Sequence, residues 1–239
     1  MPVIESGSPA PVAPAAPAGL SSRILRAGTL VLLATSLSLA IGSAIASAQA
    51  GAGDAAKGKL MFDKLCVTCH GAQAQGNKAL GAPALWQQES WYLVAQLEKF
   101  KSGARGSHAK DTGGAQMRPM AAQLTDAAAV ANVAAYVKTL KGTAPVATLK
   151  GDAVAGKATY TKVCAACHGP AAKGQLALKA PALAGQADWY MVTQLTKFRA
   201  GIRGADPRDV TGAQMKGMAA SLPTDKAVAD VVTYIASLK

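Results

Sequence analysis

The pattern of apolar and polar positions along the chain predicts helices. Two stretches, which begin near Ser90 and near Asp188, place an apolar residue at every third position. Two later stretches begin after Thr125 and Thr224 and carry an apolar stripe at helical spacing. The stripe residues are Val130, Val133, Val137 and Leu140 in one stretch and Val228, Val231, Ile235 and Leu238 in the other. Strict alternation of apolar and polar residues is absent, so we expect an all-α protein.

The predicted helices recur because the chain after residue 51 is one unit written twice. Every pair of equivalent residues is separated by 98 positions, without a gap, and from Cys66 to Thr125 the residue 98 positions further on is identical at 32 of 60 positions. Asp54 and Asp152 are equivalent N-cap candidates for a first helix in each copy. A solenoid would have more and shorter repeats. We therefore predict two tandem domains, over residues 51–145 and 146–239.

Residues 1–50 differ in composition from the repeated unit. The first twenty are rich in proline and alanine and have no helical or strand period, so we expect them not to fold. Two arginines then precede an apolar run over residues 27–46, and small residues follow it. This order predicts a secretory signal peptide that is cleaved after Ala48 or Ala50. The alternative is an uncleaved segment that anchors the protein to the inner membrane.

Each copy contains the order C-x-x-C-H, which is the attachment pattern of a c-type haem. Two cysteines at this spacing form thioethers with the two vinyl groups of haem, and the adjacent histidine supplies an imidazole ligand to the iron. The residues are Cys66, Cys69 and His70 in the first copy and Cys164, Cys167 and His168 in the second. A thioredoxin-like redox pair and a zinc site are the alternatives. Neither requires histidine at that place, so we predict two covalently attached haem c groups that use all four cysteines.

A second iron ligand is expected from methionines about 50 residues after each haem motif. Met117 and Met120 lie in one loop before the last predicted helix, and Met215 and Met218 lie in the equivalent loop. A thioether raises the reduction potential of haem relative to a second histidine. The alternative is a methionine that fills a gap in the core. Both methionines of a pair cannot bind the same iron, and position alone does not separate them.

Two prolines and a third histidine are also relevant to the predicted haem sites. The carbonyl groups of Pro83 and Pro181 are candidate acceptors for the outer N–H of His70 and His168, which would fix each imidazole. An ordinary loop role is the alternative. His108 has no histidine at the equivalent position and is expected to be a solvated loop residue.

Arg105 and Arg203, each within Gly-x-Arg-Gly, are candidate partners of the haem propionates. A guanidinium group matches a carboxylate with two parallel hydrogen bonds. A place in the core or at the surface is the alternative, and the sequence leaves both readings open.

The charge of the chain is strongly positive, with 25 Lys and Arg against 13 Asp and Glu. Without residues 1–50 the charge is 23 minus 12, or +11. A basic surface favours nucleic acid, anionic lipid or an acidic protein. Haem is attached to C-x-x-C-H outside the cytoplasm, which excludes nucleic acid and predicts a periplasmic protein. An acidic redox partner therefore remains.

Two class I cytochrome c domains in tandem resemble the cytochrome c4 family of dihaem electron carriers, over about Gly53 to Lys239. The likeness includes Trp-Tyr followed by Gln-Leu, a Phe-Lys-Ser-Gly or Phe-Arg-Ala-Gly stretch, the M-x-x-M stretch and the closing helix. The resemblance implies that Met117 and Met215 are the iron ligands. It also implies a pseudo-twofold arrangement with the two haems near each other.

The resemblance and the motifs together predict a periplasmic dihaem cytochrome that moves single electrons and is not an enzyme. The expected partners are redox proteins, such as a terminal oxidase, a quinol–cytochrome c reductase or a dehydrogenase, and peripheral association with a membrane is compatible with them. The alternatives are a haem c subunit of a membrane oxidase or dehydrogenase complex and, less well supported, a dihaem peroxidase. A peroxidase needs an open iron, against which a methionine candidate in both copies argues.

Overall fold

The computed structural model describes residues 53–238. The predicted leader, with its signal peptide or membrane anchor, lies outside these residues. Over residues 53–238 the regular structure is helical, and the extended backbone is limited to two isolated bridges, Asn77 with Ala82 and Gln175 with Ala180. None of the helices in this part of the chain has the length and apolar character needed to cross a membrane. The predicted all-α class is therefore confirmed.

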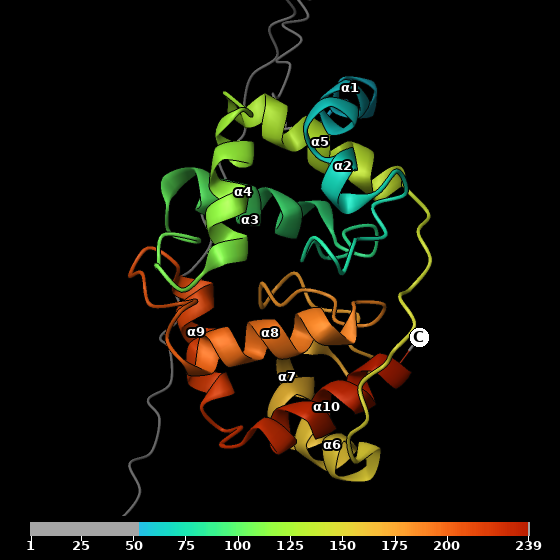
Figure 1. Ribbon diagram of the computed structural model, residues 1–239, viewed down its shortest axis with the longest axis vertical. Helices are drawn as coiled ribbons and strands as arrows, with labels where there is room; N and C mark the ends of the chain where they lie inside the picture. The colour runs from blue at the N-terminus through green and yellow to red at the C-terminus, as the bar shows by residue number, and fades with distance from the viewer. Residues whose placement is uncertain (1–52, 239) are drawn as a thin grey trace, which may run out of the picture. The chain divides into compact units, whose positions relative to one another are not determined.

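The first half of the described chain contains five helices (Figure 1). They are α1 (Ala55–Leu65), α2 (Val67–His70), α3 (Ser90–Ser102), α4 (Thr112–Ala122) and α5 (Ala127–Thr139). The side chain of Asp54 caps α1 by accepting hydrogen bonds from the N–H groups of Ala56 and Lys57. Gly103, in the left-handed region with φ of 77°, ends α3. These boundaries agree with the sequence signals for helix starts and stops.

The second half repeats the order of helices with one local difference. Its elements are α6 (Ala153–Thr159), the π-helical η1 (Tyr160–Cys164), α7 (Ala165–His168), α8 (Asp188–Arg199), α9 (Val210–Ala219) and α10 (Asp225–Ser237). The segment between Thr139 and Ala153, drawn in yellow, joins the two halves (Figure 1). α6 and η1 together replace the single α1, so the repeat in sequence is not a perfect repeat in structure.

Each core forms where the first and last helices of a half cross closely. A Cβ atom at Gly58 would lie 1.9 Å from the carbonyl oxygen of Asn132, and one at Gly156 would lie 2.0 Å from that of Asp230. The crossing buries Phe62 completely and leaves Tyr160 only 1% exposed. The apolar stripe of the last helix packs on them, so the stripes predicted from spacing are the cores of the two halves.

The methionine pairs lie in helices and not in loops, which corrects one expectation. Met117 and Met120 belong to α4, and Met215 and Met218 belong to α9. The sequence misled because glycines, and Pro119 in one copy, disfavour a helix. Aspartates cap these helices by accepting a hydrogen bond from the backbone N–H three residues on, Asp111 from Gly114 and Asp209 from Gly212.

Polar side chains tie the two halves together by reciprocal hydrogen bonds. The amide nitrogen of Gln88 donates to the carbonyl of Ala182, and that of Gln186 donates to the carbonyl of Ala84, each at 3.0 Å. The two hydrogen bonds are equivalent, because Gln88 and Gln186 are 98 positions apart, and so are Ala84 and Ala182. Reciprocal contacts of this kind are what a pseudo-twofold relation between the halves produces.

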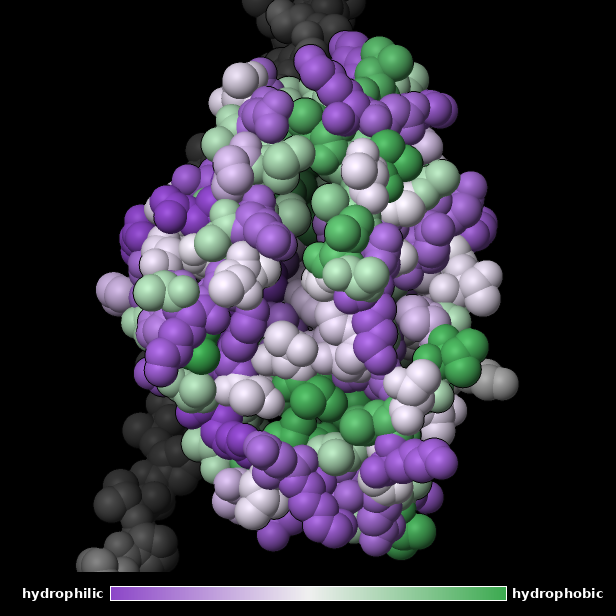
Figure 2. All heavy atoms as spheres, viewed as in Figure 1, coloured by the Kyte–Doolittle hydropathy of each residue, from purple (hydrophilic) through white to green (hydrophobic). Residues whose placement is uncertain are grey.

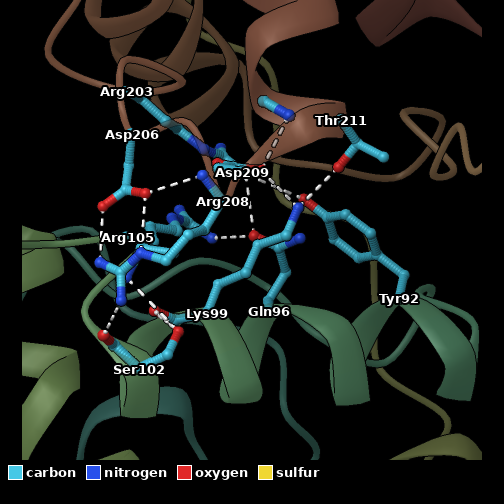
Figure 3. Close-up of polar contacts among 12 residues, drawn as sticks. Tyr92, Gln96, Lys99, Ser102, Arg105, Arg203, Asp206, Arg208, Asp209 and Thr211 are labelled. Carbon is cyan, nitrogen blue, oxygen red and sulfur yellow. Dashed lines mark hydrogen bonds and ion pairs between the residues drawn. The ribbon is translucent and has the colours of Figure 1, made fainter.

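Two buried arginines form the centre of the same interface (Figure 3). Arg105 donates to Gln96 of its own half and to Tyr190 and Gln194 of the other half. Arg203 makes the equivalent set, with Gln194 of its own half and with Tyr92 and Gln96 across the interface. Each guanidinium group also lies over a phenylalanine ring of its own half, with 4.5 Å from Cζ to the ring centroid. The arginines thus join the halves through buried guanidinium groups.

Candidate haem sites

The two motif histidines are buried at the ends of short helices. His70 ends α2 and His168 ends α7, and their exposed fractions are 5% and 4%. Each Nδ1 lies near the carbonyl oxygen of a proline, at 2.9 Å for Pro83 and 2.8 Å for Pro181. The expected contact with the proline carbonyl is therefore present in both halves. With Nδ1–H donating to the carbonyl, Nε2 carries a lone pair available to a metal.

The same surroundings favour the neutral form of each imidazole. Burial lowers the pKa of His70 and of His168, and it outweighs the hydrogen bond to the proline carbonyl, which acts in the opposite direction. A neutral imidazole is the form that binds a metal ion. Both histidines are therefore ready ligands at neutral pH.

None of the four cysteines forms a disulfide. Cys69 and Cys167 are exposed, whereas Cys66 and Cys164 are partly buried. Burial, followed by the neighbouring cysteine of the same motif, raises the pKa of Cys66 and of Cys164 to about 11. Within residues 53–238, no group of three or more histidine, cysteine or acidic side chains is placed to hold a metal ion. The thiols therefore fit covalent attachment to haem better than a structural zinc site.

Three of the four methionines in these two pairs are half-buried. Met117 and Met215 are half-buried at equivalent positions of α4 and α9. Met218 is exposed to 42%. The Sδ atom of Met120 accepts a hydrogen bond from the side chain of Gln123, at 3.9 Å. Burial thus separates Met215 from Met218, whereas Met117 and Met120 are both half-buried and burial does not choose between them.

The surface of the first half is hollowed between α2 and α4, and hydrophobic side chains form part of the rim of the hollow (Figure 2). The motif histidine ends one of these helices and Met117 lies in the other. A porphyrin ring, whose flat faces are hydrophobic, fits a hollow beside these two helices.

Each of the two buried arginines of the interface has one hydrogen-bond donor left over. The Nε atoms of Arg105 and Arg203 are buried and have no hydrogen-bond partner among the described residues. Such an unpaired donor is costly unless a bound group supplies an acceptor. A haem propionate has the right charge for it. The residues present therefore fit haem c at the thiols, at the imidazoles and at these donors.

Sequence reasoning missed the residues that join the halves. Gln88, Gln186 and the lysine–aspartate pairs described below are each present in both copies at the spacing of 98. Their presence in both copies indicated that these residues matter, but it did not show which of them face the other half. His108 is exposed, as expected for a solvated loop residue.

Comparisons with known proteins agree with this geometry. The cytochrome c family profile matches residues 55–141 and again residues 153–239. A cytochrome c4 from Thiocapsa roseopersicina is 34% identical over 195 residues, which cover 78% of this chain and 93% of that protein. A thiosulfate dehydrogenase electron acceptor from Stutzerimonas stutzeri is 34% identical over 183 residues, covering 72% of this chain and 78% of that protein.

A solved structure shows the same arrangement of helices. The crystal structure of reduced recombinant cytochrome c4 from Pseudomonas stutzeri matches with a TM-score of 0.62 and 27% identity, over 79% of this chain and 100% of that chain. Two family matches in tandem, two C-x-x-C-H motifs and this fold confirm the prediction of two covalently attached haem c groups and of a carrier instead of an enzyme. The chain therefore belongs to the cytochrome c family and is a dihaem electron carrier of the cytochrome c4 type.

Proposed function

We propose that this carrier moves single electrons through two haems with histidine and methionine as axial ligands. His70 and Met117 hold the first iron, and His168 and Met215 hold the second. The observation that supports this most directly is the repeated geometry of each histidine, whose Nδ1 is fixed by a proline carbonyl while Nε2 remains available. The half-buried methionine at the equivalent place in both halves is the second support.

The residues of the chain have separate roles in this proposal. Haem iron supplies the one-electron redox step when it is bound. The four motif cysteines tether the rings, the prolines orient the imidazoles, and the methionine thioethers favour the reduced state relative to a second histidine. A ligand on both sides of each iron leaves no position for a substrate. The domains that carry the two sites span residues 51–145 and 146–239.

The proposed partners are redox proteins in the periplasm. The Stutzerimonas stutzeri relative is named as an acceptor of electrons from thiosulfate dehydrogenase, so a dehydrogenase of this kind is a candidate donor. A terminal oxidase is the candidate acceptor, and the basic charge of the chain favours an acidic docking face on either partner. The alternative function is that of a haem c subunit in a membrane oxidase or dehydrogenase complex, which would stay with the membrane when salt is used to wash it.

Carbon monoxide tests the axial ligands. We expect the visible spectrum of the reduced holoprotein to stay unchanged when the gas is added, because both irons have two strong ligands. In Met117→Ala and in Met215→Ala one haem should bind the gas, which serves as the positive control. Binding by the unaltered protein would show an open iron and would favour an enzyme or a sensor.

A further inference from the structure

Two lysines reach from one half to the other and end on aspartates that begin the methionine-bearing helices. Lys99, on α3, places Nζ 2.5 Å from Oδ1 of Asp209, the N-cap of α9 (Figure 3). Lys197, on α8, places Nζ 2.6 Å from Oδ1 of Asp111, the N-cap of α4. Each half thus supplies a cation to the helix start of the other half.

The carboxylate oxygen that meets the lysine is also the one that caps the helix. Oδ1 of Asp209 accepts the N–H of Gly212 at 2.8 Å, and Oδ1 of Asp111 accepts the N–H of Gly114 at 3.1 Å. An N-cap aspartate satisfies one of the free N–H groups of the first helical turn. The lysine of the opposite half therefore helps to fix the oxygen on which the first turn depends.

Burial makes the lysines necessary for the charge balance. The Asp209 side chain is 1% exposed and that of Asp111 is 4% exposed. Burial alone raises the pKa of Asp111, but the hydrogen bond and charge of Lys197, the N–H of Gly114 and the charge of Arg105 outweigh it and hold the pKa below its usual value. Removing one partner of a buried ion pair leaves an uncompensated charge, which is strongly unfavourable.

The two contacts differ in one respect. Lys99 also donates to the hydroxyl of Thr211, at 2.6 Å, whereas the equivalent position in α4 is Gly113, which has no side chain to accept a bond. Lys99 therefore makes two bonds at the start of α9, whereas Lys197 makes one at the start of α4.

The methionines follow at a fixed and short distance along the helix. Met215 comes six positions after Asp209, and Met117 comes six positions after Asp111. Six residues are less than two turns of an α-helix, or about 9 Å. A helix whose first turn loosens therefore loses support close to the methionine.

We propose that Lys99 and Lys197 are positioning residues for the methionine ligand of the opposite half. Lys99 holds α9, and through it Met215, while Lys197 holds α4, and through it Met117. This inference rests on the proposed function, in which these methionines bind the irons. It makes the axial ligation of each haem depend on a residue of the other half.

The test is to replace each lysine and to observe each methionine–iron bond separately. In the ferric holoprotein a bound methionine gives a far-red charge-transfer band, and in the reduced protein its methyl group gives a ring-current-shifted NMR signal. Met117→His and Met215→His assign one set of signals to each haem. We expect Lys99→Met to raise the affinity of the second haem for imidazole, which competes with Met215, by about tenfold. Lys197→Met should do the same at the first haem only.

Three controls separate positioning from a general loss of stability. Lys59→Met removes a lysine–aspartate contact of the same 2.5 Å length that lies within one helix, and it should leave both haems unchanged. Lys99→Arg keeps the positive charge and should restore the affinity for imidazole toward that of the unaltered protein. Thermal melting followed by far-ultraviolet circular dichroism reports whether each variant folds.

The outcomes distinguish this inference from the proposed function. If Met215→His leaves every methionine signal in place, the ligand assignment is wrong and the inference falls with it. If Met215→His removes one signal but Lys99→Met changes neither haem, or changes both equally, the ligand assignment stands and positioning across the interface is refuted.

Discussion

Single glycines decide how closely the first and last helices of each half approach each other. At Gly58 an added Cβ atom would lie 1.9 Å from a backbone oxygen of α5, and 2.9 Å from Cβ of Tyr136. Backbone cannot move aside as a flexible side chain can. The crossing therefore requires a residue without a side chain, although glycine is unfavourable in a helix by about 1 kcal/mol relative to alanine.

We expect Gly58→Ala to lower the free energy of unfolding by about 1–3 kcal/mol, because the steric conflict outweighs the gain in helix propensity. Gly217→Ala is the matched control, since nothing lies within 4 Å of a Cβ atom there and the equivalent position carries Pro119. It should be neutral or stabilising. Urea unfolding of both holoproteins checks the pair, and equal losses would show that the close crossing is not the cause.

One residue also makes the two haem attachment regions differ. Tyr160, in η1, donates its hydroxyl to the carbonyl of Gly169 at 2.6 Å, just after the second haem motif. Burial, with a smaller effect of Cys164 and Tyr234, raises the pKa of Tyr160 to about 12. The equivalent residue of the first half is Phe62, which has no hydroxyl. The second motif is therefore held by a bond that the first lacks.

At the scale of elements, a buried aspartate fixes the start of α8 to the segment that joins the halves. One oxygen of Asp188 accepts the N–H groups of Thr148 and Leu149, at 2.5 and 2.7 Å. Burial raises its pKa, but these two bonds and one from the N–H of Trp189 outweigh it, so the pKa of Asp188 lies below its usual value. The ionised carboxylate is the form that the fold stabilises.

The lowered pKa of Asp188 determines how its contribution to stability changes with pH. Asp188 contributes to the free energy of unfolding at any pH above its pKa in the unfolded chain, which is near 3.8. This contribution is lost as the pH falls through the lower pKa that Asp188 has in the folded protein. We expect Asp188→Asn to cost about 1–3 kcal/mol at pH 7 and to weaken the further loss of stability below about pH 4. Urea midpoints at both pH values measure this.

Asp225→Asn is the control for that measurement, because Asp225 is 90% exposed and pairs with Arg199 at the surface. A surface pair contributes little. If the two variants lose the same stability at pH 7, the buried bonds of Asp188 are not what fixes the segment.

The elements that sequence predicts well are those whose signal is local. The N-caps Asp54 and Asp152, the end of α3 at Gly103 and the stripe on α5 all follow from residues that lie close together in the chain. The helical state of the methionine stretches did not follow. It depends on caps that are completed by residues about 90 to 110 positions away, such as Lys99 on Asp209.

The sites show the same division between local and distant information. The haem motifs and the proline carbonyls could be identified because each set lies within about 20 residues. The role of Arg105 could not, because its partners Tyr190 and Gln194 come from the other half. Sequence indicated that these residues were repeated, but only the fold showed that they face one another.

At the scale of the whole molecule, charge governs encounters with a partner. Residues 51–239 carry +11, which haem propionates offset by at most about four charges. We expect electron transfer with an acidic redox protein to slow as salt rises, because screening over about 8–10 Å weakens the attraction. Stopped-flow rates at several ionic strengths measure it, and an uncharged hydroquinone is the control. A rate with the acidic protein as insensitive to salt as that control would exclude electrostatic docking.

The reciprocal bonds between the halves have a consequence for assembly. Arg105, Lys99 and Gln88 of the first half each form a hydrogen bond with a residue of the second half. Two copies of the chain that exchange their second halves would form the same bonds between chains. The thirteen residues from Leu140 to Asp152 reach at most about 45 Å when extended. Monomer and exchanged dimer then contain the same interface, and protein concentration, with the strain on this segment, sets the balance between them.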